Sequence, residues 1–178
     1  FQDLKLSALG LGCMRLPVVG NDDGIIDEAS AAEMVEYAVS RGINYFDTAW
    51  GYHGGNSETA MGKILEKYPR ESFYLASKFP GYDLTNMPKA EGIFERQLEK
   101  CRVGYFDFYL FHNVCEMNID AYLDSKYGIY EYLLKQKENG RIRHLGFSAH
   151  GGYDTMKRFL EAYGEKMEFC QLQINYID

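Results

Sequence analysis

The stretch Phe106-Asp-Phe-Tyr-Leu-Phe-His112 is an apolar, strand-like run that ends in one polar side chain. Two earlier runs, Ile43-Asn-Tyr-Phe-Asp47 and Phe73-Tyr-Leu-Ala-Ser-Lys78, have the same form. The polar ends follow one another at intervals close to the roughly 30 residues that a strand, a helix and the next strand occupy in a parallel sheet. The chain therefore contains repeated strand–helix units, each with a polar residue at the same point.

The rest of the chain fits the same alternation of strands and helices. Ser30-Ala-Ala-Glu33 has the form of a capping box and predicts a helix start, and Gly42 predicts the end of that helix. Ser57 begins the next predicted helix, and Pro88 is expected in the first turn of the third. We predict strands at residues 9–16, 43–46, 73–77, 106–111, 144–147 and 169–174, helices from residues 30, 57 and about 86 and at 130–138 and 154–162, and a long loop at 113–126.

Strict alternation of strand and helix predicts a parallel sheet, which is either an open doubly wound sheet or part of a barrel. An open sheet that binds a dinucleotide would carry GxGxxG after its first strand, but Leu9-Gly-Leu-Gly-Cys-Met14 lacks the third glycine. A (β/α)8 TIM barrel fits better, although it typically takes about 250 residues. We therefore expect an α/β chain that forms a single partial domain over residues 1–178, a TIM barrel truncated after the sixth strand.

The composition excludes several classes of protein. The chain is 46% hydrophobic with a net charge of −7, and its basic residues are scattered, which argues against nucleic acid or an anionic membrane as a partner. No apolar run reaches the roughly 18 residues of a membrane span, and no signal peptide is apparent. The cysteines, Cys13, Cys101, Cys115 and Cys170, form no CxxC pair. We expect a cytoplasmic protein without disulfides or a metal.

Four polar side chains could act together in one reaction: Asp47, Tyr52, Lys78 and His112. Side chains at the C-terminal ends of barrel strands converge on one face, where catalytic groups lie. A lysine held by an aspartate favours the phenolate of a nearby tyrosine, and a histidine can polarise a substrate carbonyl. This set suits reduction of a carbonyl, in which hydride from a reduced cofactor reaches carbon while Tyr52 protonates oxygen.

These residues lie in motifs that resemble those of the aldo-keto reductases. The stretch Gly42-Ile-Asn-Tyr-Phe-Asp-Thr-Ala-Trp-Gly-Tyr52, followed by Ser57-Glu58 and Gly62, resembles the first signature of that family. Leu75-Ala-Ser-Lys78 is similar to its lysine strand and Asp107-Phe-Tyr-Leu-Phe-His112 to its histidine strand. The resemblance covers nearly the whole chain. It implies reduction of aldehydes or ketones, with Tyr52 as general acid and NADPH, or else NADH, as cofactor.

The same resemblance implies further site residues. Ser148 and Gln171, with Gln173 as its same-face neighbour, match positions that hold the nicotinamide carboxamide. Ala149-His150 departs from the family, in which an asparagine frequently follows the serine. The implied catalytic residues are Asp47, Tyr52, Lys78 and His112, the implied cofactor residues are Cys13, Met14, Asp47, Asn113, Ser148 and Gln171, and the implied substrate residues are Trp50 and His112.

Two alternatives to a carbonyl reductase stay open. The seventh and eighth strands of the family carry an aromatic and basic residues that hold the cofactor, and they are not in this chain, so we expect weak or no NADPH binding by the chain alone. A non-catalytic cofactor-sensing or scaffold relative is one alternative. The other is an inactive fragment that self-associates through unpaired barrel edges. Part of the chain also resembles bacterial members with a C-terminal iron–sulfur segment, whose cluster ligands are not in this sequence.

Overall fold

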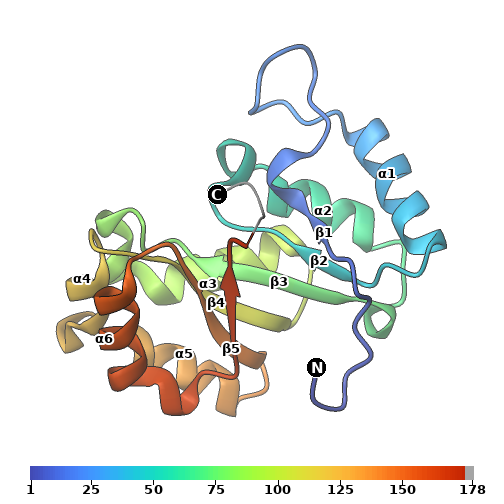
Figure 1. Cartoon of the computed structure of the whole chain (residues 1–178). Helices are drawn as coiled ribbons and strands as arrows, with labels where there is room; N and C mark the ends of the chain where they lie inside the picture. Colours follow the sequence, from blue (N-terminus) through green and yellow to red (C-terminus); the bar gives the residue numbers. More distant parts are fainter. Residues whose placement is uncertain (175–178) are drawn as a thin grey trace. The chain divides into compact units, whose positions relative to one another are not determined.

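The computed structural model describes residues 1–174, and its six strands form one sheet in sequence order, from β1 to β6 (Figure 1). The pairs β1–β2, β2–β3 and β5–β6 are parallel. The strands are β1 (Leu11–Gly12), β2 (Tyr45–Asp47), β3 (Tyr74–Phe79), β4 (Phe106–Val114), β5 (Ile142–Ala149) and β6 (Phe169–Leu172). The α-helices are α1 (Glu28–Ser40), α2 (Ser57–Leu65), α3 (Ala90–Cys101), α4 (Ile119–Leu123), α5 (Ile129–Glu138) and α6 (Tyr153–Tyr163).

The described residues divide into two compact units. Unit 1 comprises Phe1–Ser77 and Arg96–Asp107, and unit 2 comprises Lys78–Glu95 and the described part of Phe108–Asp178. Strands β3 and β4 and helix α3 each pass from one unit to the other. The candidate residues divide in the same way, so each group is described within its own unit.

The first helix begins earlier than predicted. Asp27 is the N-cap of α1, and its carboxylate accepts hydrogen bonds from the backbone N–H of Ser30 at 3.1 Å and from the Ser30 hydroxyl at 2.8 Å. The capping box predicted at Ser30 is therefore wrong, because Asp27 satisfies the free N–H groups one turn earlier. Gly42 ends the helix as predicted, with a φ of +83° that other residues rarely adopt.

Strands β3 and β4 extend further than predicted. Lys78 lies within β3, which continues to Phe79, and His112 lies within β4, which continues to Val114. Pro88 lies in a 3₁₀ helix, Leu84–Lys89, that precedes α3 rather than in the first turn of α3. The predicted long loop contains α4 and a further 3₁₀ turn, Ser125–Tyr127. Polar residues inside the strands account for the short predictions, since an apolar pattern ends where they begin.

Each unit has its own packed interior. In unit 1 a Cβ on Gly62 of α2 would lie 2.3 Å from the backbone oxygen of Lys100, so only glycine permits this approach of α2 to α3. In unit 2 the core is aromatic: the Phe111 ring contacts the rings of Tyr122 and Phe159, both with centroids 5.4 Å away. These contacts fix the helices behind the strands that carry the candidate residues.

Candidate active site

Asp47 is the last residue of β2, the middle strand of unit 1, and it is buried with 8% of its surface exposed. The sheet register places it beside Gly12 of β1 and Ala76 of β3. Its side chain therefore lies at the C-terminal end of the strand, where barrel enzymes carry their functional groups.

Tyr52 opens a 3₁₀ turn, Tyr52–Gly55, that follows β2, and it is half-buried. The next residue, His53, is buried and has a φ of +54°. Its Nε2 accepts a hydrogen bond from the Leu16 N–H at 2.9 Å, so Nδ1 carries the proton and donates to the Asp23 carbonyl at 2.8 Å. His53 thus fastens the Tyr52 turn to the loop before α1, a role that no sequence pattern indicated.

Cys13 and Met14 follow β1 in a 3₁₀ turn, Cys13–Arg15, so the strand predicted at residues 9–16 ends earlier than expected, at Gly12. Cys13 is fully buried, whereas 57% of the Met14 surface is exposed. The hydroxyl of Ser57, at the start of α2, donates to the Cys13 carbonyl at 2.9 Å and also lies 2.9 Å from the Thr48 hydroxyl. The serine of the first signature therefore ties the end of β1 to the end of β2.

Trp50 is half-buried, and the Lys100 ammonium lies 4.7 Å from its ring centroid. A cation held over an indole face is a favourable contact. This contact occupies part of the ring. The role of Trp50 in the substrate pocket stays a prediction.

Lys78 is one of the most deeply buried residues of unit 2, with 1% of its surface exposed. Its neighbour Ser77 is fully buried as well, and successive side chains of a strand point to opposite faces. The side chains of Ser77 and Lys78 therefore lie on opposite faces of the sheet. A buried ammonium is costly, so its presence requires hydrogen-bonding or charged partners.

His112 is a neutral imidazole over the physiological pH range. Burial is the largest cause that lowers its pKa to about 3, and electrostatic interactions with Lys78 and His150 contribute to the same shift. The Tyr82 ring packs edge-on against the imidazole with centroids 5.2 Å apart. A neutral imidazole retains one N–H that can donate to a carbonyl oxygen.

This pKa predicts a pH-dependent stability. The unfolded chain takes up a proton on His112 near its ordinary pKa of about 6.5, whereas the folded protein does not until about pH 3, so the free energy of unfolding falls as the pH drops through this window. His112→Gln should make the dependence shallower by up to about 1.4 kcal/mol for each pH unit. Urea denaturation between pH 4 and 7 measures it, with Tyr37→Phe, at an exposed residue of α1, as control. Parallel pH dependences for wild type and His112→Gln would contradict the assignment.

Tyr122 of α4 joins the ends of two strands in unit 2. It is buried, and its hydroxyl lies 2.8 Å from the His112 carbonyl and 3.3 Å from the Phe79 carbonyl. A Cβ on Gly81 would lie 2.2 Å from the same hydroxyl, so glycine is required there. The backbone around Lys78 and His112 is therefore fastened from the helix side.

Asn113 has a left-handed backbone with a φ of +58°. Its N–H donates to the Ser148 hydroxyl at 2.8 Å, and its carbonyl accepts from the side-chain amide of Asn118 at 2.8 Å. Asn118 is itself buried, and its side-chain oxygen accepts from the Cys115 N–H at 3.0 Å. Both sides of the strained residue are held, which is typical of functional sites.

The groups around Ser148 fit a nicotinamide carboxamide. Ser148 lies in register with Gln171 on the neighbouring strand, and Gln171 is exposed. The Ser148 hydroxyl accepts from Asn113 and keeps its own proton to donate. A carboxamide both donates and accepts hydrogen bonds, as do the side chains of Ser148, Asn113 and Gln171. Gln173, the same-face neighbour, lies beyond the end of β6 and is exposed.

The structure brings two sets of predicted residues together, one in each unit. In unit 1, Cys13 directly follows the β1 residue that pairs with Asp47. In unit 2, the charge of Lys78 acts on His112, and Asn113 is bonded to Ser148. The combination of Asp47 and Tyr52 with the unit 2 residues stays a prediction.

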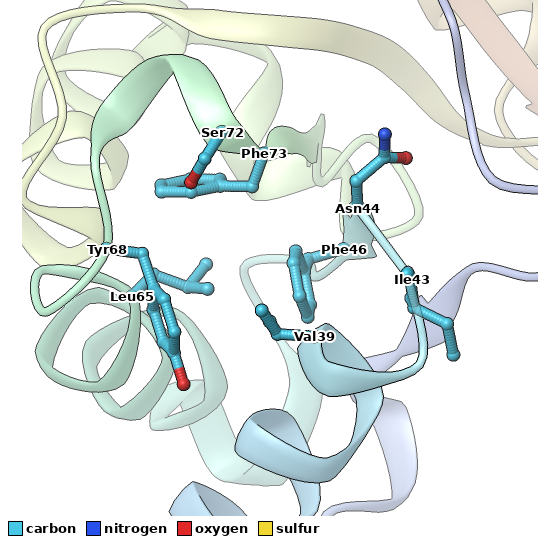
Figure 2. A pocket seen from close by; sticks show the side chains of 9 residues that line it. Val39, Ile43, Asn44, Phe46, Leu65, Tyr68, Ser72 and Phe73 are labelled. Atoms are coloured by element: carbon cyan, nitrogen blue, oxygen red, sulfur yellow. The ribbon is translucent and has the colours of Figure 1, made fainter.

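Unit 1 also contains a cavity of about 150 Å³, which Figure 2 shows between the side chains of Val39, Phe46, Leu65 and Phe73. Asn44 and Ser72, which precede β2 and β3, also line it. The cavity therefore lies at the N-terminal ends of these strands, away from Asp47 at the C-terminal end of β2. It is not the candidate active site.

The aldo/keto reductase family model matches residues 8–177. The chain belongs to the aldo/keto reductase family. A probable aldo-keto reductase of Glycine max is 32% identical over 88% of this chain and 45% of its own length. The NADH-specific methylglyoxal reductase of Escherichia coli is 27% identical over 99% of this chain and 57% of its own length. The chain thus spans about half the length of these relatives.

Solved structures confirm the fold class. A putative aldo-keto reductase from Pseudomonas aeruginosa superposes with a TM-score of 0.76 at 25% identity, over 99% of this chain and 66% of that one. The holo form of a Bacillus halodurans aldo-keto reductase gives a TM-score of 0.72 at 28% identity, over 97% of this chain and 55% of that one. The chain therefore carries the first six strands of a (β/α)8 barrel, as the sequence predicted.

Between residues 1 and 174, no helix combines the length and the apolar character needed to cross a membrane. Within the same residues, no group of three or more His, Cys, Asp or Glu side chains is placed to bind a metal ion. None of the four cysteines, all within the described residues, forms a disulfide: Cys13, Cys101 and Cys115 are buried, and Cys170 is exposed.

Proposed function

We propose that the protein is an NAD(P)H-dependent reductase that converts aldehyde or ketone carbonyls to alcohols. Its membership of a family of NAD(P)-dependent oxidoreductases supports the reaction type. The observation that carries the proposal is the pair of Lys78 and His112 near the C-terminal ends of neighbouring strands, one a buried ammonium and the other a neutral imidazole. A purely structural sheet has no need of a buried ammonium beside a histidine.

In this proposal Tyr52 is the general acid. Its hydroxyl proton moves to the carbonyl oxygen as the carbon is reduced, and solvent afterwards returns a proton to the phenolate. Lys78 stabilises the developing phenolate, and Asp47 holds the ammonium charged and oriented. His112 donates its single N–H to the same carbonyl oxygen, which orients and polarises the substrate.

The cofactor site is proposed from residues whose chemistry matches it. Ser148, Asn113 and Gln171 would hold the nicotinamide carboxamide, and Cys13 and Met14 would lie along the ribose. Bound NAD(P)H supplies the hydride that the carbonyl carbon receives. Trp50 would lie beside the substrate. NADPH is the proposed cofactor, and a Klebsiella pneumoniae relative of this fold has been solved in complex with NADPH.

Carbonyl reduction with NADPH and with NADH tests the proposal. The E. coli relative is named for NADH and for methylglyoxal, so both cofactors and methylglyoxal belong in the first assay beside simple aldehydes. Turnover is followed by the loss of nicotinamide fluorescence. Cofactor binding without turnover of any carbonyl would instead favour the non-catalytic, cofactor-sensing alternative. Absence of both would favour the inactive, self-associating fragment.

A further inference from the structure

Glu58 in α2 is a fully buried carboxylate that the proposed mechanism does not use. Its Oε1 accepts hydrogen bonds from the Ser77 hydroxyl and from the Gln97 amide, both at 2.6 Å. Its Oε2 accepts from the Lys100 ammonium at 2.7 Å. All four residues lie in unit 1, and we refer to them as the Glu58 cluster.

The polar groups of the cluster are hydrogen-bonded to one another. The amide nitrogen of Gln97 donates to Glu58 and also to the Ser77 hydroxyl at 2.9 Å, and that hydroxyl donates to Glu58 in turn. Glu58 and Ser77 are fully buried, and the Lys100 side chain is 10% exposed. Buried ion pairs seldom stabilise a protein more than packed apolar residues of the same size would. A role in fixing geometry is therefore the stronger explanation for this one.

Two contacts of the cluster lead to the residues assigned to catalysis. Ser77 precedes Lys78 in β3, so the bond from Ser77 to Glu58 fixes the strand from the face opposite to the Lys78 side chain. The Lys100 ammonium lies over the ring of Trp50, which stands two positions before Tyr52. One buried carboxylate thus connects the backbone of the proposed acid and that of the proposed lysine.

We propose that the Glu58 cluster is a positioning device for the reaction: it holds Lys78 through Ser77 and the Tyr52 turn through Lys100 and Trp50. The inference rests on the proposed function. A small displacement of either group lowers the rate, because proton transfer depends on the distance between heavy atoms.

Two variants disconnect the cluster without leaving a buried charge unpaired. Ser77→Ala removes the link to β3 and keeps the ion pair. The double variant Glu58→Gln with Lys100→Met neutralises both partners at similar volume and removes the cation over Trp50. The matched control is Arg96→Gln, which removes an exposed pair with Glu99 on the same helix.

Trp50 is the only tryptophan in the sequence, so its fluorescence reports on the cluster independently of activity. The double variant should lower the emission anisotropy of Trp50, and Ser77→Ala should leave it unchanged. In an active enzyme both should lower kcat about tenfold or more with little change in KM. Both should also shift the alkaline limb of the pH–rate profile. Thermal unfolding measurements serve to check that each variant is folded.

The outcomes separate the two proposals. Folded variants with wild-type kcat and pH–rate profile would show that the cluster is merely structural and overturn the inference. Unchanged Trp50 anisotropy in the double variant would also overturn it, whether or not the protein is active. A wild-type protein that reduces no carbonyl contradicts the proposed function, and because the inference rests on that function it falls with it.

Discussion

Tyr52→Phe should lower kcat for carbonyl reduction by about 10³-fold, because general acid catalysis contributes on the order of 10² to 10⁴. The substitution removes one hydroxyl from a half-buried side chain, so cofactor affinity and stability should remain close to those of the wild type. Steady-state kinetics with the best carbonyl substrate measure the loss, and NADPH titration verifies that the cofactor still binds.

The control for Tyr52→Phe is Tyr37→Phe, which removes a hydroxyl from an exposed residue of α1. This variant should keep full activity. If Tyr52→Phe retained more than about a tenth of wild-type kcat, another proton donor would be required and the assignment of Tyr52 would be wrong.

Asp107→Asn should lower the free energy of unfolding by about 3 kcal/mol, because it leaves a partly buried guanidinium without its counter-charge. Asp107 is 1% exposed, and its Oδ2 accepts from Arg70 at 2.6 Å and from the Leu75 N–H at 2.9 Å. The Arg70 guanidinium also stacks on the rings of Phe73 and Tyr105. Urea denaturation at neutral pH measures the change.

Asp120→Asn is a matched control, since Asp120 pairs with Arg158 at the same distance of 2.6 Å but its side chain is 85% exposed. An exposed pair contributes less than about 1 kcal/mol, so this variant should be nearly as stable as the wild type. Equal losses in the two variants would show that burial does not set the strength of the Asp107 pair.

The sequence predicted the strand–helix alternation because the strands are largely apolar and the segments between them have helical patterns. It placed the strand ends less well. Lys78, His112 and Asn113 continue β3 and β4, and an apolar pattern cannot extend a strand through polar residues that tertiary contacts bury. The N-cap of α1 is Asp27 and not the predicted Ser30 for a related reason. The choice between the two residues depends on how the chain enters the helix.

The sequence predicted those site residues that recur at the same point of each strand–helix repeat, as Asp47, Lys78 and His112 do. It did not predict their supporting residues. Glu58 was visible only as part of a family motif, and its partners Gln97 and Lys100 come from a helix whose sequence gives no sign of a buried carboxylate nearby. Asn118 and Tyr122 lie in a segment predicted as a loop. Contacts between residues far apart in sequence leave no local pattern.

The left-handed backbone of Asn113 has a consequence for any test of its proposed role at the cofactor. Most replacements change two quantities at once, the chemistry of the side chain and the ease with which the chain adopts a φ of +58°. Asn113→Ala alone would therefore overstate the importance of the amide. A survey that pairs Asn113→Gly with Asn113→Asp separates backbone tolerance from side-chain chemistry, because both residues accept this conformation more readily than alanine does.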